Sequence, residues 1–249
     1  MNKIITVTNQ KGGVGKTTTA HALVSGLQSR GYKILVIDLD PQSNLTYTLG
    51  IENPEYTIYE LFTDEAKPEQ AIKKTDQGDI IPGSLFLAGA DMEFTKPGRE
   101  YILKEIIEPL QEQYNYIIID TPPALGILTT NALTASGSLI IPMGADIFSL
   151  QGLSQLQGLI ENVRKYCNKN LLIEGLLITR YNGRIVLSRE LKEVMEDAAL
   201  KLNTKVFNSV IREGVAIREA QALQTDIFTN TPKANVTKDY NKFIDELLS

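Results

Sequence analysis

A glycine-rich loop close to the first residue constrains the fold of this chain more than any other feature. Residues 3–8 are apolar and rich in β-branched side chains, which is typical of a buried strand. The loop sequence Asn-Gln-Lys-Gly-Gly-Val-Gly-Lys-Thr-Thr follows at residues 9–18, and residues 16–30 have the pattern of a helix that ends at Gly31. Strand, glycine loop and helix in this order are typical of phosphate binding at a helix N-terminus.

The residue types of the loop suit that chemistry. Glycines let the backbone turn tightly, so that N–H groups point at phosphate oxygens. Lys16 can reach the β- and γ-phosphates, and the Thr17 hydroxyl can bind Mg²⁺. The common pattern Gly-x4-Gly-Lys-[Ser/Thr] is kept at its end, although Gln10 replaces its first glycine. The predicted nucleotide contacts of the loop are Gly12, Gly13, Val14, Gly15, Lys16, Thr17 and Thr18.

Strand patterns alternate with helix patterns along the rest of the chain. Strands are predicted at residues 33–38, 116–120, 138–141 and 171–179, with short pieces at 85–88 and 205–207. Helices are predicted at residues 58–62, 100–113, 127–135, 150–166, 188–202 and 236–248. Strands that are apolar on both faces favour a mostly parallel, twisted α/β sheet with helices on both faces. Without repeats or linker-like segments, residues 1–249 are predicted to form one domain.

Carboxylates follow two of the predicted strands. Asp38 ends the predicted strand at residues 33–38 and Asp40 follows two residues later, and Asp120 ends the strand at 116–120. The carboxyl ends of parallel strands are where open α/β sheets form their sites. We therefore expect Asp120 to hold Mg²⁺ through water, Asp40 to orient the attacking water, and Asp38 to support the metal and the loop.

Composition excludes several classes of protein. No run approaches the ~20 apolar residues of a membrane-spanning helix. A single cysteine, Cys167, leaves no internal disulfide or cysteine-based zinc site, and a single histidine, His21, disfavours a Ser-His-Asp triad. The net charge of −5 argues against a surface that is basic throughout.

Together these motifs resemble the ParA family of deviant Walker-A ATPases, within the superfamily that also contains MinD. Lys11 matches the signature lysine of that superfamily, and the segments at 178–184, 210–213 and 216–220 look like family blocks. The resemblance covers essentially the whole chain and is to the small form without an N-terminal helix-turn-helix. It implies a phosphate-loop ATPase that uses ATP and Mg²⁺ with low basal turnover, in which Lys11, Lys16 and Asp40 are catalytic.

The resemblance also implies partners. Two subunits would enclose two ATP molecules, with Lys11 reaching the partner's nucleotide, and the dimer would bind DNA without sequence preference. A centromere-binding partition protein would stimulate hydrolysis and release, in a cytoplasmic, nucleoid-associated setting on a plasmid or chromosome. The residues expected near the adenine are Arg180, Tyr181, Asn182 and Arg212, and those expected to contact DNA are Arg184 and Arg218.

The distribution of charge allows such a DNA surface. Residues 1–150 carry 11 basic and 18 acidic residues, a net −7, whereas residues 151–249 carry 14 and 12, a net +2. Dimerisation would double a localised basic patch and make DNA binding depend on ATP. The last helix has acidic residues beside its apolar ones, so we expect it to pack against the body and not against a membrane.

Three alternatives remain open at this point. The same ATPase could position a protein cargo over the nucleoid, or act at a membrane as MinD relatives do. A third alternative is a metabolic ATP-dependent ligase or a metal-cluster maturation enzyme. Detection of a product other than ADP and phosphate would favour this third alternative.

Overall fold

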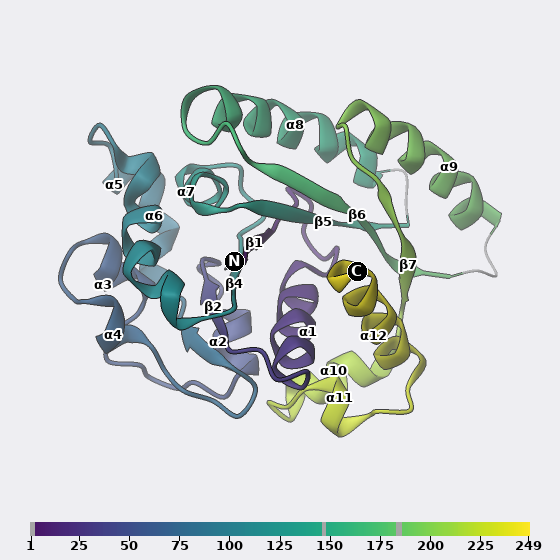
Figure 1. The fold of residues 1–249 in the computed structure, drawn as a ribbon, viewed down its shortest axis with the longest axis horizontal. Coiled ribbons are helices and arrows are strands. Elements are labelled where there is room, and N and C mark those ends of the chain that lie inside the picture. The colour runs from purple at the N-terminus through teal and green to yellow at the C-terminus, as the bar shows by residue number, and fades with distance from the viewer. Residues whose placement is uncertain (1–2, 146–147, 183–185) are drawn as a thin grey trace.

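A seven-stranded sheet forms the centre of the computed structural model. The structure describes the backbone of residues 3–145, 148–182 and 186–249. It describes side chains at residues 3–145, 152–182 and 194–249. Its strands, all paired in parallel, lie in the order β3-β2-β4-β1-β5-β6-β7 (Figure 1). Their bounds are β1 Lys3–Val7, β2 Ile34–Asp38, β3 Asp79–Ile81, β4 Tyr116–Asp120, β5 Ser138–Gly144, β6 Leu172–Tyr181 and β7 Val206–Arg212. The predicted α/β fold with a parallel sheet is confirmed.

Helices cover both faces of the sheet. One face packs against α1 (Lys16–Gln28) and α12 (Asn235–Leu248), with α10 (Val215–Ala222) and α11 (Ile227–Asn230) beside them. The other face packs against α3 (Ile58–Phe62), α6 (Ile102–Ile107), α7 (Ile127–Ala135), α8 (Phe148–Tyr166) and α9 (Val186–Lys201). The short helices α2 (Asn44–Thr48), α4 (Pro68–Ala71) and α5 (Ala90–Glu93) lie in the connections around β2 and β3.

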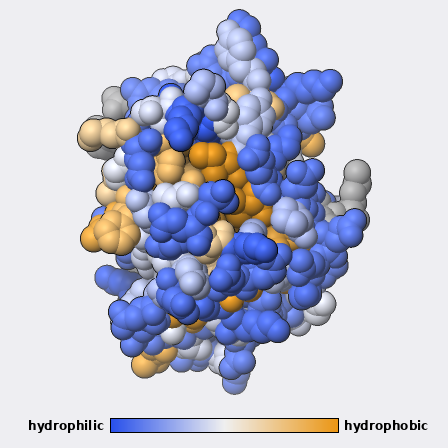
Figure 2. All heavy atoms as spheres, turned by 90° about the vertical axis from the view of Figure 1, so that its left-hand side faces the viewer, coloured by the Kyte–Doolittle hydropathy of each residue, from blue (hydrophilic) through white to orange (hydrophobic). Residues whose placement is uncertain are grey.

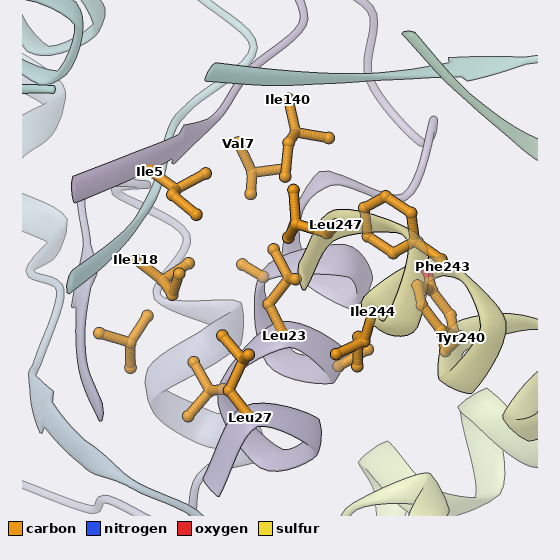
Figure 3. Close-up of a cluster of buried hydrophobic side chains, with 14 of the residues drawn as sticks. Ile5, Val7, Leu23, Leu27, Ile118, Ile140, Tyr240, Phe243, Ile244 and Leu247 are labelled. Atoms are coloured by element: carbon orange, nitrogen blue, oxygen red, sulfur yellow. The ribbon is translucent and has the colours of Figure 1, made fainter. Parts of the chain in front are cut away.

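The core between the sheet and α1 explains why the C-terminal helix belongs to the body. Leu23 and Leu27 of α1 meet Phe243, Ile244 and Leu247 of α12 beneath the strands (Figure 3). Fully burying such side chains stabilises a fold by about 1.5–3 kcal/mol each. The expected packing of the last helix against the body is confirmed.

The prediction of a strand at residues 85–88 is wrong. This segment is a 3₁₀ helix, η1 (Leu85–Gly89), whose first turn is capped by the Ser84 side chain. Only Leu87 is buried, while Leu85 and Phe86 are exposed, so there is no two-faced apolar strand to pair with the sheet. The side of the molecule that bears α3, α4 and α5 is mainly hydrophilic, with hydrophobic residues gathered near its centre (Figures 1 and 2).

The bounds of several other elements differ from prediction by one to three residues, and two elements differ more. The helix expected at 100–113 is divided into η2 (Arg99–Tyr101), α6 and η3 (Glu108–Gln113). Pro109, at the start of η3, cannot donate a backbone hydrogen bond, which accounts for the end of α6. The short strand expected at 205–207 continues to Arg212 as β7. The longer β7 matters because it brings Arg212 to the carboxyl edge of the sheet, beside the glycine loop.

Candidate nucleotide site

The glycine loop lies between the central strand β1 and helix α1. Gly13 and Gly15 have φ values of 72° and 85°, in the left-handed region that glycine adopts without strain. Gly15 is the N-cap of α1 and brings no side chain to cap it, so the first N–H groups of the helix remain available to an anionic ligand.

Hydrogen bonds to strands β5 and β6 hold this loop in place. Asn9 donates from Nδ2 to the Pro142 carbonyl of β5 at 2.7 Å and accepts from the Lys11 backbone N–H at 3.0 Å. The Thr179 hydroxyl of β6 donates to the Val14 carbonyl at 2.8 Å. The sequence does not predict Asn9 and Thr179 as loop supports, because the partner of each lies more than 130 residues away along the chain.

Lys16 is buried under the loop with its ammonium directed at backbone and carboxylate oxygens. Its Nζ donates to the Lys11 carbonyl at 3.3 Å. Burial lowers the pKa of Lys16, while the charges of Asp120 and Asp40 raise it. This is the environment in which a phosphate group would be a favourable additional partner for the ammonium.

The carboxylates at the ends of β2 and β4 come together as the sequence predicts. Asp38 and Asp120 pair directly in the strand register and are both fully buried. Burial and, as the last of several smaller effects, the charge of Asp40 raise the pKa of Asp38 to about 6, against three hydrogen bonds that lower it. Burial, then the charge of Asp38, raise the pKa of Asp120 well above its usual range, although Thr17 and Lys16 favour its charged form.

Asp120 differs from Asp38 in its hydrogen bonds. Asp38 accepts three hydrogen bonds from protein donors. Neither carboxylate oxygen of Asp120 is in hydrogen-bond geometry with a donor in the residues that the structure describes, although the Thr17 hydroxyl is near enough to favour its charged form. A buried carboxylate without such partners is costly unless a cation or ligand meets it. The oxygens of Asp120 and Thr17 therefore fit a hard cation such as Mg²⁺.

No three acidic, histidine or cysteine side chains converge as a metal cage in the described part of the chain. Magnesium does not require such a cage, because it keeps several waters and uses one or two carboxylates together with phosphate oxygens. The donor set at the end of β4 is of this sparse type.

A cavity of about 250 Å³ opens beside the glycine loop, and several residues that are predicted to contact the adenine or DNA line it. Arg180, Arg212 and Arg218 line it together with Gly13, Gly15 and Thr18 of the loop. Tyr181 and Asn182 line an adjoining open hollow that shares Arg212 and Arg218 with this cavity. Arg184 lies outside the described residues.

Arg212 is held in place by the C-terminal helix. Its Nε and Nη2 donate to the two oxygens of Asp239 at 2.8 and 2.7 Å, and its pKa is raised by this hydrogen bonding. Asp239 was missed by the sequence analysis, which gave α12 a packing role alone. The guanidinium therefore lies at the cavity in a fixed orientation, with its Nε–H engaged by a carboxylate.

The parallel sheet, the glycine loop on its central strand and the acidic ends of the neighbouring strands define a phosphate-loop nucleoside triphosphatase. A family model described as an AAA domain matches residues 2–173. The chain is 41% identical over 245 residues to sporulation initiation inhibitor protein Soj of Bacillus subtilis, with 96% of each chain covered. It is 35% identical over 254 residues to chromosome partitioning protein ParA of Caulobacter vibrioides, covering 99% of this chain and 94% of that protein.

Solved structures give the same fold. Cobyrinic acid a,c-diamide synthase from Mycobacterium smegmatis, with bound ADP and magnesium, superposes with a TM-score of 0.86 and 32% identity, covering 100% of this chain and 94% of that one. The same protein has also been solved with an ATP analogue and magnesium. On the sequence relatives and the family model, the chain belongs to the ParA-type ATPases of the ParA/MinD family.

Proposed function

We propose that this chain is an ATP-dependent DNA partition protein whose ATP-bound dimer binds DNA without sequence preference. The observation that carries the ATPase part is the convergence of the Lys16 ammonium and the unpartnered Asp120 carboxylate beneath the glycine loop. The similarity of this chain to Soj and ParA proteins over almost their whole length supports the partition role.

In this proposal each site residue has a distinct task. Backbone N–H groups from Gly12 to Thr18 and the Lys16 ammonium bind the phosphates, and Thr17 and Asp120 hold Mg²⁺. Bound Mg²⁺ would neutralise charge on the β- and γ-phosphates. Asp40 orients the attacking water, Asp38 supports the metal and the loop, and Lys11 reaches the nucleotide of the second subunit.

The proposed base and DNA contacts lie on the C-terminal side of the loop. Arg180, Tyr181, Asn182 and Arg212 line the cavity and its adjoining hollow and are proposed to surround the adenine. The exposed Arg218 of α10 lines both spaces, so a DNA contact there would be sensitive to the nucleotide. Arg184 is proposed as the second DNA contact. A centromere-binding partition protein is proposed to stimulate hydrolysis and release the dimer.

DNA retention with ATP, ADP and no nucleotide, at about 0.05 and 0.2 M salt, tests this function. We expect retention only with ATP, weakening at the higher salt. Arg218→Ala should weaken retention, whereas Lys104→Ala, which removes an exposed lysine of α6, should not. Equal retention in all nucleotide states would contradict the proposal.

A second candidate is an ATP-dependent ligase, favoured by the 32% identity to cobyrinic acid a,c-diamide synthase. The two functions differ in their products, because a partition ATPase releases only ADP and phosphate. Analysis of products formed from ATP in the presence of candidate carboxylic acids and amide donors separates them.

No helix in the described part of the chain has the length and apolar character to cross a bilayer.

A further inference from the structure

Thr46 of α2, to which the sequence assigns no role, makes hydrogen bonds to both Asp38 and Gly83. Its hydroxyl donates to Oδ2 of Asp38 at 2.7 Å, and its backbone N–H donates to the same oxygen at 2.9 Å. The hydroxyl oxygen in turn accepts from the Gly83 N–H, just after β3, at 2.8 Å. The side chain is 5% exposed, so these partners are not exchanged for water.

The other oxygen of Asp38 continues the chain of hydrogen bonds toward Asp40. Oδ1 of Asp38 accepts from the Asp40 backbone N–H at 3.1 Å. Asp40 then closes its own turn, because its Oδ1 accepts from the Gln42 N–H at 3.0 Å and its carbonyl from the Ser43 N–H at 2.8 Å. The position of the Asp40 carboxylate therefore depends on where Asp38 is held.

We propose that Thr46 is a positioning residue, whose hydroxyl fixes Asp40 for hydrolysis by joining Gly83 to Asp38. This inference rests on the proposed ATPase function, in which Asp40 orients the attacking water. In this role Thr46 acts through Asp38 and needs no contact of its own with the nucleotide or with a metal ion. Misplacement of a catalytic group by about 1 Å can cost on the order of 100-fold in rate, so small shifts of Asp40 have measurable effects.

Gly83 is closely packed against Ser43 and Asp38, so there is little room beside it for a group other than the Thr46 hydroxyl. A Cβ built on Gly83 would lie 2.9 Å from the Ser43 hydroxyl and 3.0 Å from Cγ of Asp38. Valine has the shape of threonine without the oxygen, so Thr46→Val would leave the Gly83 N–H without its acceptor and Asp38 with one donor fewer. Serine keeps the oxygen and removes only a methyl group.

Thr48 provides a matched control on the same short helix. It is equally buried, at 3% exposure, but its hydroxyl donates only to the Asn44 carbonyl of its own helix, at 2.8 Å. Thr48→Val therefore removes a buried hydroxyl from α2 without touching Asp38 or Gly83.

The test compares the steady-state ATP hydrolysis of wild type, Thr46→Val, Thr46→Ser and Thr48→Val with Mg²⁺ in excess. We expect Thr46→Val to lower kcat about tenfold or more while KM for ATP changes less than about threefold. Thr46→Ser should retain kcat within about threefold of wild type, and Thr48→Val should behave as wild type.

Several outcomes would overturn the inference. A kcat for Thr46→Val close to wild type, an equal loss in Thr48→Val, or no rescue by serine would each contradict a positioning hydroxyl. If Thr46→Val does not fold, Thr46→Ala and Thr46→Ser replace it, and equal kcat values in these two variants would contradict the inference. Absence of turnover in wild type contradicts the proposed function itself, which distinguishes the two failures.

Discussion

Asp38 and Asp120 occupy matching positions on the neighbouring parallel strands β2 and β4, and both side chains are completely buried. Burial raises the pKa of both carboxyl groups, the charge of Asp38 raises that of Asp120 further, and the charge of Asp40 makes a smaller contribution to that of Asp38. The ligand-free protein thus bears an electrostatic cost at the place where a nucleotide and a cation are proposed to bind. This arrangement trades stability of the empty protein for affinity toward its ligand.

We predict that Asp120→Asn stabilises the nucleotide-free protein at about pH 7.5 by about 1–3 kcal/mol, because asparagine has no ionised form whose burial beside Asp38 opposes folding. Because folding raises the pKa of Asp120, the contribution of this carboxyl to the free energy of unfolding of wild type is highest at low pH, where it is protonated. That contribution falls as pH rises through the pKa of the folded protein. The gain should therefore be smaller at about pH 5.5. Urea denaturation at both pH values measures it.

The control for this variant is Asp64→Asn, at an exposed position with a φ of 62° that asparagine tolerates. It should change stability little at either pH. Destabilisation by Asp120→Asn of the same size at both pH values would contradict electrostatic strain in the empty site. ATP hydrolysis by Asp120→Asn should be lost in either case.

Lys16 and Asp40 are predicted to fail at different steps. Lys16→Ala should abolish productive nucleotide binding, because it removes the buried ammonium under the loop. Asp40→Ala should bind ATP and form the dimer, but it should hydrolyse ATP on the order of 100-fold more slowly than wild type. Equilibrium binding of a fluorescent ATP analogue and phosphate release separate these effects. Normal turnover in Asp40→Ala would exclude its role in orienting water.

His21 of α1 is predicted to make stability depend on pH outside the nucleotide site. Its Nε2 lies 2.6 Å from Oε1 of Gln77, and burial lowers its pKa. A base whose pKa is lowered by folding contributes stability above its unfolded pKa and loses it as pH falls through that value. Relative to His21→Gln, wild type should therefore lose about 1 kcal/mol between about pH 7.5 and 5.5. A pH-independent difference between the two proteins would show that His21 does not titrate on unfolding.

Two glycines in helices are predicted to respond oppositely to the same substitution. A Cβ at Gly26 of α1 would overlap Ile244 Cδ1 of α12 and lie 3.0 Å from Phe228 Cζ, whereas one at Gly158 of α8 would meet nothing within 4 Å. Gly26→Ala should destabilise by about 1–3 kcal/mol through overpacking. Gly158→Ala should stabilise by about 0.5–1 kcal/mol, because alanine favours a helix interior. Thermal unfolding of both variants gives the comparison, and stabilisation by Gly26→Ala would contradict the tight packing of α1 on α12.

Local patterns were sufficient to predict most of the sheet. Strands β1, β2 and β4 are short apolar runs that end in a glycine loop or a carboxylate, and α7 was predicted at its observed bounds, Ile127–Ala135. In contrast, β3 has three residues, which is too short for a periodic signal. Helix α2 is not predicted, although α3 has the same length and is predicted at its observed bounds, Ile58–Phe62. The segment at 85–88 was misassigned because apolar residues alone do not distinguish a strand from a 3₁₀ turn.

The sequence by itself determined the class of site, because a phosphate loop needs a contiguous order of strand, glycines, lysine and threonine, and the two acidic strand ends lie next to their strands. Only the tertiary structure decided how these groups are held. Asn9 with Pro142, Thr179 with Val14, and Arg212 with Asp239 pair residues that lie between 27 and 165 positions apart. Such pairs leave no periodic or spacing signal in a single sequence, because packing of the sheet and α12 brings them together only after the chain has folded.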